Sequence, residues 1–406
     1  MKKNCIVAQS GGPTAAINAS LAGIVQGITD SGYFEHIYGS IHGIQGVIRE
    51  QFLDLTSSTP EFINQLKCTP AMYLGSCRFK LPNWKDDTDS YKEIFDIFEK
   101  MNVGAFFYIG GNDSMDTVDK LSQYAAETGS NIKIAGVPKT IDNDLVCTDH
   151  TPGFGSAAKY IAGSIREIAY DTYIYDVESV TIVEIMGRDA GWLTAASVLA
   201  RNGKNLAPHL IYLPEVAFDE EAFLSDLKNL IKIHQNIIVA VSEGIHDASG
   251  AYLSATDAAA DKFGHAQLSG AGKYLETLVK NRLGIKVRSV EVNVLQRCAG
   301  HMASKTDLDE SFELGKKAVQ LVQDGKTGFM TTLNRTRNVP YSYELSSVPV
   351  CEVANKAKAV PLDWINKEKN NVTEEMVAYL APLVLGEVPI EYEAGIPKYL
   401  DISHLL

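Results

Sequence analysis

Two short polar segments directly follow two apolar runs, and this arrangement narrows the possible folds of the chain more than any other feature. The segment GGNDS at 110–114 comes after the run 105–109, and PKTIDND at 138–144 comes after 134–137. Both runs have the length and composition of strands buried in a parallel sheet. The sequence therefore predicts that small and acidic residues gather at the carboxyl edge of such a sheet, where open α/β folds bind ligands.

Predicted strands and helices alternate along the chain, which is typical of mostly parallel sheets covered by helices on both faces. The predicted strands are 5–8, 105–109, 134–137, 180–186, 236–242 and 287–292. The predicted helices are 14–27, 89–101, 114–128, 153–170, 191–201, 219–234, 307–322 and 374–385. Because 406 residues exceed one ordinary core, we expect an α/β fold of two Rossmann-like lobes, with the active site in the cleft between them.

Two further segments depart from this alternation. Residues 244–270 are rich in Ala, Ser, Asp and Gly and predict a surface insertion. The segment from 327 onward has no clear strand–helix alternation, so we expect it to pack over the lobes.

The charge and the cysteines exclude some classes of partner and compartment. A net charge of −13 disfavours duplex nucleic acid and anionic membranes, which both bind basic surfaces. The six cysteines show no CxxC spacing and fit idle thiols in a reducing cytosol. No signal peptide and no membrane span are recognised, so we expect a cytoplasmic protein.

The turns after the predicted strands carry groups suited to phosphate chemistry. In GGPTAAIN at 11–18, Gly11 and Gly12 would let backbone amides approach an anion at a helix start, although such a pair also fits a purely structural turn. Asp142 and Asp144 stand two residues apart in one loop, where a metal site and an Asx-turn are the alternatives. A lysine and an additional carboxylate nearby favour phosphoryl transfer from a small, densely charged donor.

Cations and a buried carboxylate occur in other predicted loops. Arg78 lies in a loop, and Arg188 lies in a tight turn after the predicted strand 180–186. Glu243 ends a buried strand, where an unpaired carboxylate is costly unless it holds a ligand hydroxyl or caps a helix.

Together these segments resemble the phosphofructokinase family. The motifs that match, in the family's order, are GGPTAAIN at 11–18, LGSCRF at 74–79, GGNDS at 110–114, PKTIDND at 138–144, MGR at 186–188, SE at 242–243 and LQR at 295–297. The resemblance implies an enzyme that phosphorylates the 1-hydroxyl of fructose 6-phosphate with Mg²⁺ as cofactor. It also implies a homodimer or homotetramer, and we expect neither nucleic acid nor membrane as partner.

The resemblance further implies roles for individual residues. Asp142 is implied to be the general base of a catalytic set of Asp142, Lys139, Asp113 and Arg188. The residues implied to bind the sugar phosphate are Thr140, Ile141, Met186, Gly187, Glu243, Arg288 and Arg297. One of the two arginines in this set would come from a neighbouring subunit. The donor would be held by Gly11, Gly12, Arg78, Gly111 and Ser114, and the metal by Asn112, Asp113, Asp142 and Asp144.

Asp113 and Lys139 indicate the identity of the donor, because ATP-using members of the family normally carry glycine at both positions. Asp113 would place a negative charge where the α-phosphate of ATP lies, and this repulsion costs on the order of several kcal/mol in a poorly screened site. Lys139 would stabilise the transferring and leaving phosphates. The resemblance is therefore to the pyrophosphate-dependent branch, whose reaction is reversible and serves glycolysis and gluconeogenesis. Taken singly, a helix cap for Asp113 and a solvated charge for Lys139 are the alternatives.

Two residues depart from the family's pattern. Asn112 stands where many relatives have an aspartate that helps to bind magnesium, so Asp142 and Asp144 are expected to take more of that role. Ser179 stands where many bacterial relatives have a 6-phosphate arginine. Arg288, Arg297 or a lysine of the insertion would have to compensate for it.

Other classes of protein stay open at this point. An ATP-dependent phosphofructokinase is the nearest alternative, followed by a non-catalytic regulatory subunit, against which an intact Asp142 argues. An oxidoreductase is less favoured, because no complete dinucleotide-binding fingerprint is present. We expect residues 1–152 and about 295–360 to form a larger, donor-binding lobe. Residues 153–294 and about 361–406 would form a smaller, sugar-phosphate-binding lobe.

Overall fold

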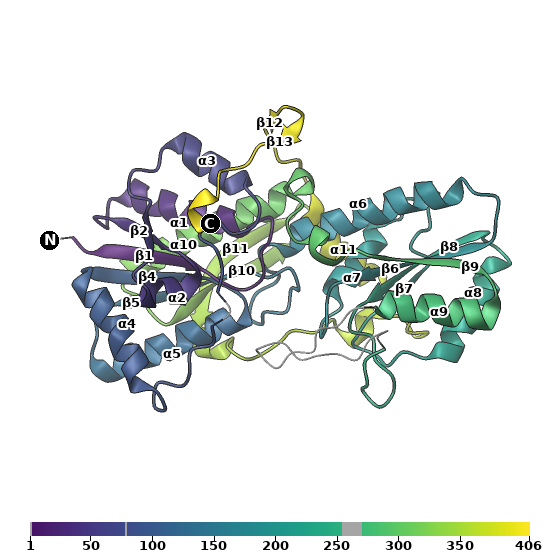
Figure 1. Cartoon of the computed structure of the whole chain (residues 1–406), viewed down its shortest axis with the longest axis horizontal. Helices are drawn as coiled ribbons and strands as arrows, with labels where there is room; N and C mark the ends of the chain where they lie inside the picture. Colours follow the sequence, from purple (N-terminus) through teal and green to yellow (C-terminus); the bar gives the residue numbers. More distant parts are fainter. Residues whose placement is uncertain (1, 78, 254–269) are drawn as a thin grey trace.

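The computed structural model describes residues 2–77, 79–253 and 270–406, which form two α/β lobes lying side by side (Figure 1). The larger lobe contains a seven-stranded sheet in the order β11-β10-β5-β4-β1-β2-β3. Its strands are β1 (Asn4–Gln9), β2 (Ile37–Ser40), β3 (Phe52–Asp54), β4 (Val103–Gly110), β5 (Lys133–Pro138), β10 (Phe329–Arg337) and β11 (Ser342–Pro349). The strands from β10 to β2 run parallel, and the edge strands β3 and β11 run antiparallel to their neighbours.

Helices cover both faces of this sheet because its central strands are apolar on both sides. Val7 and Phe107 pack in the core shared with α1 (Ile17–Ser31), α3 (Pro60–Cys68) and α10 (Lys305–Gln323). Their neighbours Ile6 and Phe106 pack in the core shared with α2 (Gly43–Ile48), α4 (Thr88–Lys100) and α5 (Asn112–Thr128). Successive side chains of a strand point to opposite faces, so each central strand contributes to both cores.

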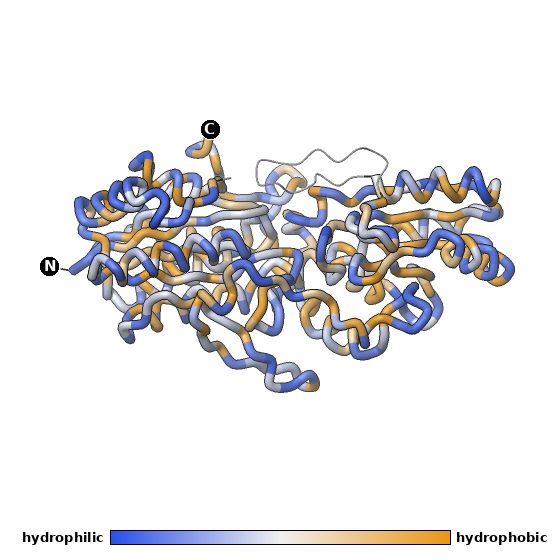
Figure 2. The backbone as a smooth tube through the Cα atoms, turned by 90° about the horizontal axis from the view of Figure 1, so that it is seen from below, coloured by the Kyte–Doolittle hydropathy of each residue, from blue (hydrophilic) through white to orange (hydrophobic). Residues whose placement is uncertain are grey.

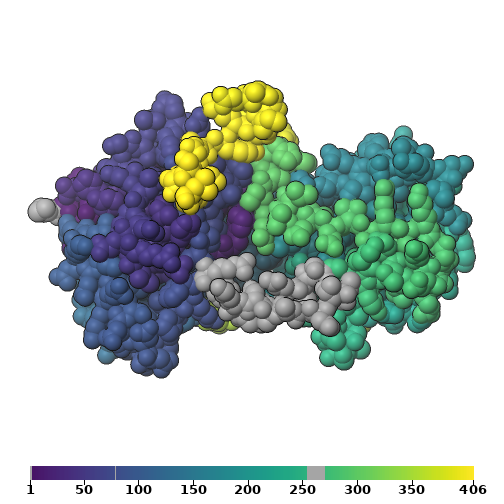
Figure 3. Space-filling model, viewed as in Figure 1, coloured from purple at the N-terminus to yellow at the C-terminus, as the bar shows by residue number. Residues whose placement is uncertain are grey.

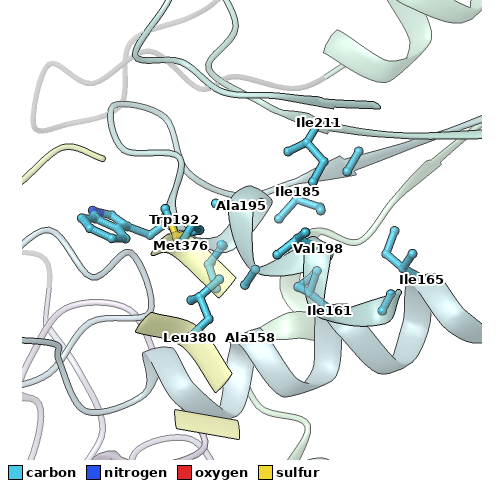
Figure 4. Packing of buried hydrophobic residues seen from close by; sticks show 14 of the residues in the cluster. Ala158, Ile161, Ile165, Ile185, Trp192, Ala195, Val198, Ile211, Met376 and Leu380 are labelled. Carbon is cyan, nitrogen blue, oxygen red and sulfur yellow. The ribbon is translucent and has the colours of Figure 1, made fainter. Parts of the chain in front are cut away.

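The smaller lobe repeats this design around a parallel four-stranded sheet in the order β7-β8-β6-β9. Its strands are β6 (Ser179–Ile185), β7 (Leu210–Tyr212), β8 (Asn236–Ser242) and β9 (Lys286–Glu291). Helices α6 (Phe154–Tyr173) and α7 (Trp192–Ala196) cover one face, and α8 (Glu220–Ile231) and α9 (Ala271–Leu283) cover the other. Figure 4 shows Ile161 and Ile165 of α6 packing near Ile185 and Ile211 of the sheet. The expectation of two α/β lobes with mostly parallel sheets is confirmed.

Hydropathy along the backbone follows these layers. Figure 2 shows apolar residues concentrated inside both lobes and polar residues on the outer turns of the helices. In the part of the chain that the structure describes, no helix is long and apolar enough to cross a membrane.

Some elements differ from those predicted from the sequence. The chain from 327 onward is not free of strands: β10 pairs with β5 through Phe329 and Met330, and β11 returns beside it as a hairpin. The helix predicted at 374–385 divides into α11 (Glu374–Leu380) and a 3₁₀ turn at Ala381–Val384 that contains Pro382, because proline disrupts the helical hydrogen-bond ladder. The helix predicted at 191–201 likewise divides into α7 and a 3₁₀ turn at Ser197–Ala200.

We expected residues 361–406 to belong to the smaller lobe, but the last residues of the chain do not. Helix α11 packs in the core of the smaller lobe, but the chain then returns to the larger lobe. Leu400 N donates a hydrogen bond to Thr69 Oγ1 (3.1 Å), and the His404 side chain bonds Tyr73 O (2.7 Å). Figure 3 shows this terminal segment, in yellow, on the surface of the larger lobe. The short hairpin of β12 (Tyr392–Glu393) and β13 (Ile396–Pro397) precedes it.

Candidate active site

Three turns of the larger lobe meet at the carboxyl edge of β1, β4 and β5. These strands are parallel neighbours, so the segments that follow them emerge at the same edge. Ser10 N donates a hydrogen bond to Ile109 O (2.9 Å), and Lys139 N donates one to Gly110 O (2.9 Å). The segments GGPTAAIN, GGNDS and PKTIDND therefore lie together.

Lys139 is buried at the centre of this edge, with an exposed fraction of 2%. Its Nζ donates a hydrogen bond to Gly12 O (2.6 Å). Gly11 has a φ of +83°, and a Cβ there would lie 3.0 Å from Lys139 Nζ, so this turn favours glycine beside the ammonium group. Burial lowers the pKa of Lys139 to about 8, against the opposing charges of Asp142 and Asp144. The alternative that Lys139 is a solvated surface charge is wrong.

Asp142 and Asp144 flank a buried asparagine in the loop after β5. Asn143 has a φ of +54° and donates from Nδ2 to Tyr379 Oη (2.9 Å), while its Oδ1 accepts from Thr151 N (3.1 Å). Burial raises the pKa of Asp142, against the charges of nearby cations. Burial and the charge of Asp142 raise the pKa of Asp144 to about 7. This loop thus holds two carboxylates whose negative charges are costly without a cation.

The smaller lobe contributes the turn after β6 and the end of β8, which are neighbouring parallel strands. Gly187 N donates to Glu243 Oε1 (3.2 Å), and Ser242 Oγ donates to Gly187 O (2.5 Å). Gly187 has a φ of +134°, and a Cβ there would lie 2.5 Å from Ala190 O, so glycine is required. Met186 directly precedes this turn and is half-buried.

Electrostatics connect the two halves of the site. Arg297, Lys139 and Arg188 all favour the ionised form of Asp142, although Arg188 belongs to the smaller lobe. Burial raises the pKa of Glu243 to about 7, and the charge of Asp142 adds to this increase. Within the described residues, Arg188 Nε has no hydrogen-bond partner although it is buried. The site therefore draws residues from both lobes.

The first turn of α5 presents its residues differently. Gly111 is the N-cap of this helix, so the alternative that Asp113 is the cap is wrong. Asp113 lies exposed in the first turn. Ser114 is buried next to Gly110, where a Cβ would lie 2.0 Å from Ser114 Oγ.

The two arginines implied to bind the 6-phosphate lie in different places. Arg297 follows a 3₁₀ turn at Asn293–Gln296 and is close enough to shift the pKa of Asp142. Arg288 pairs in register with Thr181, well before the carboxyl end of β6, and donates to Asp171 Oδ2 (2.5 Å). Arg288 therefore lies away from the Asp142 of its own chain.

Of the remaining predicted residues, some are described by the structure and others lie outside the described part of the chain. Thr140 Oγ1 accepts a hydrogen bond from Asp142 N (3.1 Å), and Ile141 packs in the core of the smaller lobe, so only the Ile141 backbone is free to face a ligand. Arg78 lies outside the described residues. Most of the predicted insertion, 254–269, and the lysine in it also lie outside them.

The carboxylates of the Asp142–Asp144 loop suit a magnesium ion whose remaining ligands include phosphate oxygens. No group of three or more His, Cys, Asp or Glu side chains placed to hold a metal occurs within residues 2–77, 79–253 and 270–406. Mg²⁺ commonly binds through one or two carboxylates together with substrate phosphates and water. Asp142 and Asp144 can provide the two carboxylates. Both polar atoms of the Asn112 amide instead bond backbone groups of Asn355 and Lys356, so the expectation that Asn112 binds the metal does not match this arrangement.

A buried ionic cluster, which was not predicted from the sequence, supports the Asp142–Asp144 loop. His150, 2% exposed, bonds Asp149 Oδ1 (2.7 Å) through Nδ1 and Glu310 Oε2 (2.6 Å) through Nε2. Arg335 Nη2 donates to Asp149 Oδ1 (2.9 Å), and Tyr379 Oη donates to Asp149 O (2.8 Å). No local sequence pattern indicates these contacts, because the paired residues are far apart in the sequence. His150 and Glu310 are 160 positions apart, and Asp149 and Arg335 are 186 positions apart.

This cluster predicts a pH dependence of stability. Against the effect of burial, the two carboxylates raise the pKa of His150 from 6.5 to about 9. Its contribution to stability should be complete below pH 6.5 and disappear as the pH rises through 9, with a total on the order of 3 kcal/mol. Urea unfolding of wild type and His150→Gln at several pH values measures this. The wild type should lose its advantage between about pH 7 and 9.5, and an advantage that grows over this range contradicts the assignment.

Comparisons with known proteins identify the family of the chain. The family model described as Phosphofructokinase matches residues 4–322. The chain therefore belongs to the phosphofructokinase family, and it is an enzyme of this family.

Within the family, it is similar to members named for pyrophosphate. It is 41% identical over 405 residues to the pyrophosphate–fructose 6-phosphate 1-phosphotransferase of Xanthomonas campestris, covering 99% of this chain and 96% of that one. It is 41% identical over 398 residues to the enzyme of the same name from Rhodospirillum rubrum, covering 96% of each. A solved structure of the pyrophosphate-dependent phosphofructokinase from Nitrosospira multiformis has a TM-score of 0.88 and 36% identity, covering 98% of this chain and 96% of that one. The resemblance to the pyrophosphate-dependent branch is confirmed.

Proposed function

We propose that this enzyme transfers a phosphoryl group from pyrophosphate to the 1-hydroxyl of fructose 6-phosphate, reversibly, giving fructose 1,6-bisphosphate and orthophosphate. The observation that carries the proposal is the buried ammonium group of Lys139, held at Gly12 O beside the Asp142–Asp144 loop. With a pKa of about 8, Lys139 is mostly charged at pH 7. A buried cation at this position suits a compact, highly charged donor.

The residues take the following parts in this mechanism. The 1-hydroxyl oxygen attacks the nearer phosphorus of pyrophosphate, its proton passes to the Asp142 carboxylate, and the bond to the leaving orthophosphate breaks. A raised pKa brings Asp142 closer to neutral pH, where a general base is most effective. Lys139 and Arg188 stabilise the charge on the phosphoryl oxygens and help to hold them in line. Backbone amides near Gly11, Gly12 and Gly111 and the Ser114 hydroxyl would hold the donor.

Bound Mg²⁺, which this family generally uses, would neutralise part of the phosphate charge. Asp142 and Asp144 would hold it, and Asp113, in the segment that lies beside theirs, would assist through water. Thr140, Met186, Gly187 and Glu243 would hold the sugar, and Arg297 would hold its 6-phosphate. Glu243, which directly follows β8, would accept a hydrogen bond from a sugar hydroxyl.

The proposal is tested by following the reaction with ³¹P nuclear magnetic resonance. Enzyme, Mg²⁺, pyrophosphate and fructose 6-phosphate should give orthophosphate and fructose 1,6-bisphosphate in equal amounts. Orthophosphate and fructose 1,6-bisphosphate should regenerate the substrates. Release of orthophosphate without fructose 6-phosphate would show a simple pyrophosphatase and contradict the proposal.

We further propose that the enzyme is a homodimer or homotetramer in which Arg288 serves the site of a neighbouring subunit. Arg288 lies on β9, an edge strand, with its guanidinium half-exposed and away from the Asp142 of its own chain.

Mixing two inactive variants tests this subunit contribution. Asp142→Ala and Arg288→Ala subunits, refolded or co-expressed together, should recover about a quarter of the wild-type activity, the statistical share of complete sites in a random dimer. No recovery despite verified hybrid formation would place Arg288 in its own chain's site, and an Arg288→Ala enzyme that is active alone would place Arg288 outside any site.

A further inference from the structure

Residues 355–360, here called the strap, join the two lobes and contact three segments of the proposed site. Val353, just before the strap, packs in the core of the larger lobe. Val360, its last residue, packs in the core of the smaller lobe. From its first to its last residue, the strap contacts first the donor side of the site, then the Asp142–Asp144 loop, and finally the sugar side.

On the donor side, the strap is held by the side chain of Asn112, at the start of α5. Asn112 Nδ2 donates to Lys356 O (2.6 Å), and Asn355 N donates to Asn112 Oδ1 (2.7 Å). Asn355 Nδ2 also donates to Asp116 Oδ1, one turn further along the helix (2.9 Å). An amide side chain can donate and accept hydrogen bonds at the same time, whereas an ionised carboxylate only accepts.

At the aspartate loop, the strap is bonded to the backbone that carries Asp144. Lys358 N donates to Asp144 O (2.7 Å), and Leu145 forms an isolated bridge with Ala357. Lys358 Nζ donates to Asp149 O (2.7 Å), in the same loop.

On the sugar side, the strap is bonded to the segment that follows Gly187 and Arg188. Trp192 Nε1 donates to Lys358 O (2.9 Å). Glu215 Oε1 accepts from both Gly191 N (2.8 Å) and Val360 N (2.9 Å), so one carboxylate oxygen joins the strap to this turn.

We propose that the strap sets the spacing between the donor-binding start of α5, the Asp142–Asp144 loop and the Arg188 turn. Asn112 is its anchor on the donor side and acts as a positioning residue, not as a metal ligand. This explains why an amide occupies a position where an aspartate would be the better magnesium ligand. The catalytic consequence rests on the proposed function, because in-line phosphoryl transfer is sensitive to shifts of about 1 Å between the reacting groups.

Two substitutions distinguish whether Asn112 anchors the strap or binds the metal. Asn112→Asp keeps the acceptor but loses the bond donated to Lys356 O, and Asn112→Ala loses both bonds. Lys356→Ala is the matched control, because the strap uses only the backbone of this exposed residue. The measurements are amide hydrogen exchange over 353–361 without Mg²⁺, thermal unfolding, steady-state kinetics with pyrophosphate, and the Mg²⁺ concentration for half-maximal rate.

The anchor predicts a distinct set of results. Exchange in the strap should be about tenfold faster in both Asn112 variants, with global unfolding little changed. Their kcat should fall by about 10- to 100-fold, while the half-saturating Mg²⁺ concentration stays within about twofold of wild type. Lys356→Ala should match wild type.

Other outcomes overturn the proposal. If Asn112→Asp lowers the Mg²⁺ requirement, or if Asn112→Ala raises it about tenfold with unchanged strap exchange, Asn112 is a ligand. Unchanged exchange and unchanged kcat would remove both roles. If wild type does not use pyrophosphate, the proposed function fails, but the exchange measurement still decides whether Asn112 holds the strap.

Discussion

An Asp142→Asn enzyme should lose about 10²- to 10⁴-fold in kcat, in both directions of the reaction, because its amide cannot take the proton of the attacking hydroxyl. The structure supports this role through the surroundings of the carboxylate. Lys139, Arg188 and Arg297 keep Asp142 able to ionise, while burial raises its pKa. The amide has nearly the same shape, so the loss should not come from unfolding.

Steady-state rates with pyrophosphate, together with the melting temperature, measure this effect. Asp189→Asn is the matched control, because Asp189 is an exposed carboxylate next to Arg188 that accepts a hydrogen bond from Tyr252 Oη (3.3 Å). It should keep activity within about a factor of two, as expected of a surface substitution. A folded Asp142→Asn enzyme with more than about a tenth of wild-type kcat would exclude Asp142 as the base.

Replacing both Asp113 and Lys139 by glycine should reduce pyrophosphate-dependent kcat by about 10²- to 10³-fold and raise the use of ATP. Loss of Lys139 removes a buried cation that stabilises the charge on the phosphates. Loss of one such electrostatic group typically lowers kcat by about this factor. Loss of Asp113 removes the charge that repels the α-phosphate of ATP.

The single variants divide these effects. Lys139→Gly should lose pyrophosphate activity without gaining ATP activity, because the Asp113 carboxylate remains. Asp113→Gly should keep most pyrophosphate activity and admit ATP. The kcat/KM for each donor in all four proteins measures the division, and a double variant that keeps pyrophosphate activity within about tenfold would contradict the role of Lys139.

The sequence predicted the central part of the fold well. Strands β4 and β5 were predicted because their residues are apolar on both faces, which is typical of central parallel strands. Strand β10 was missed because only Phe329 and Met330 pair with the parallel sheet, and its second half is polar and exposed. Local patterns carry no signal for pairing between residues so far apart in the sequence.

The site was predicted in its composition but not in its geometry. The motifs indicated that Lys139 and Asp142 belong together, and the structure places both at one sheet edge. Burial of Lys139 depends on the Gly11–Gly12 turn over it, which residue types alone do not determine. The position of Arg288 away from Asp142 follows from the register of β9 with β6, which the sequence does not show. The partners of Asn112 lie more than 240 positions away.

The preference for pyrophosphate over ATP is the decisive test of the donor specificity inferred from Asp113 and Lys139. Initial rates of the purified wild-type enzyme with fructose 6-phosphate and Mg²⁺ should be measured over matched concentrations of each donor. We expect kcat/KM for pyrophosphate to exceed that for ATP by at least about tenfold, which a charge repulsion of about 1–2 kcal/mol from the exposed, partly screened Asp113 carboxylate would produce. An enzyme that prefers ATP, or uses both donors equally well, would contradict the proposed roles of Asp113 and Lys139.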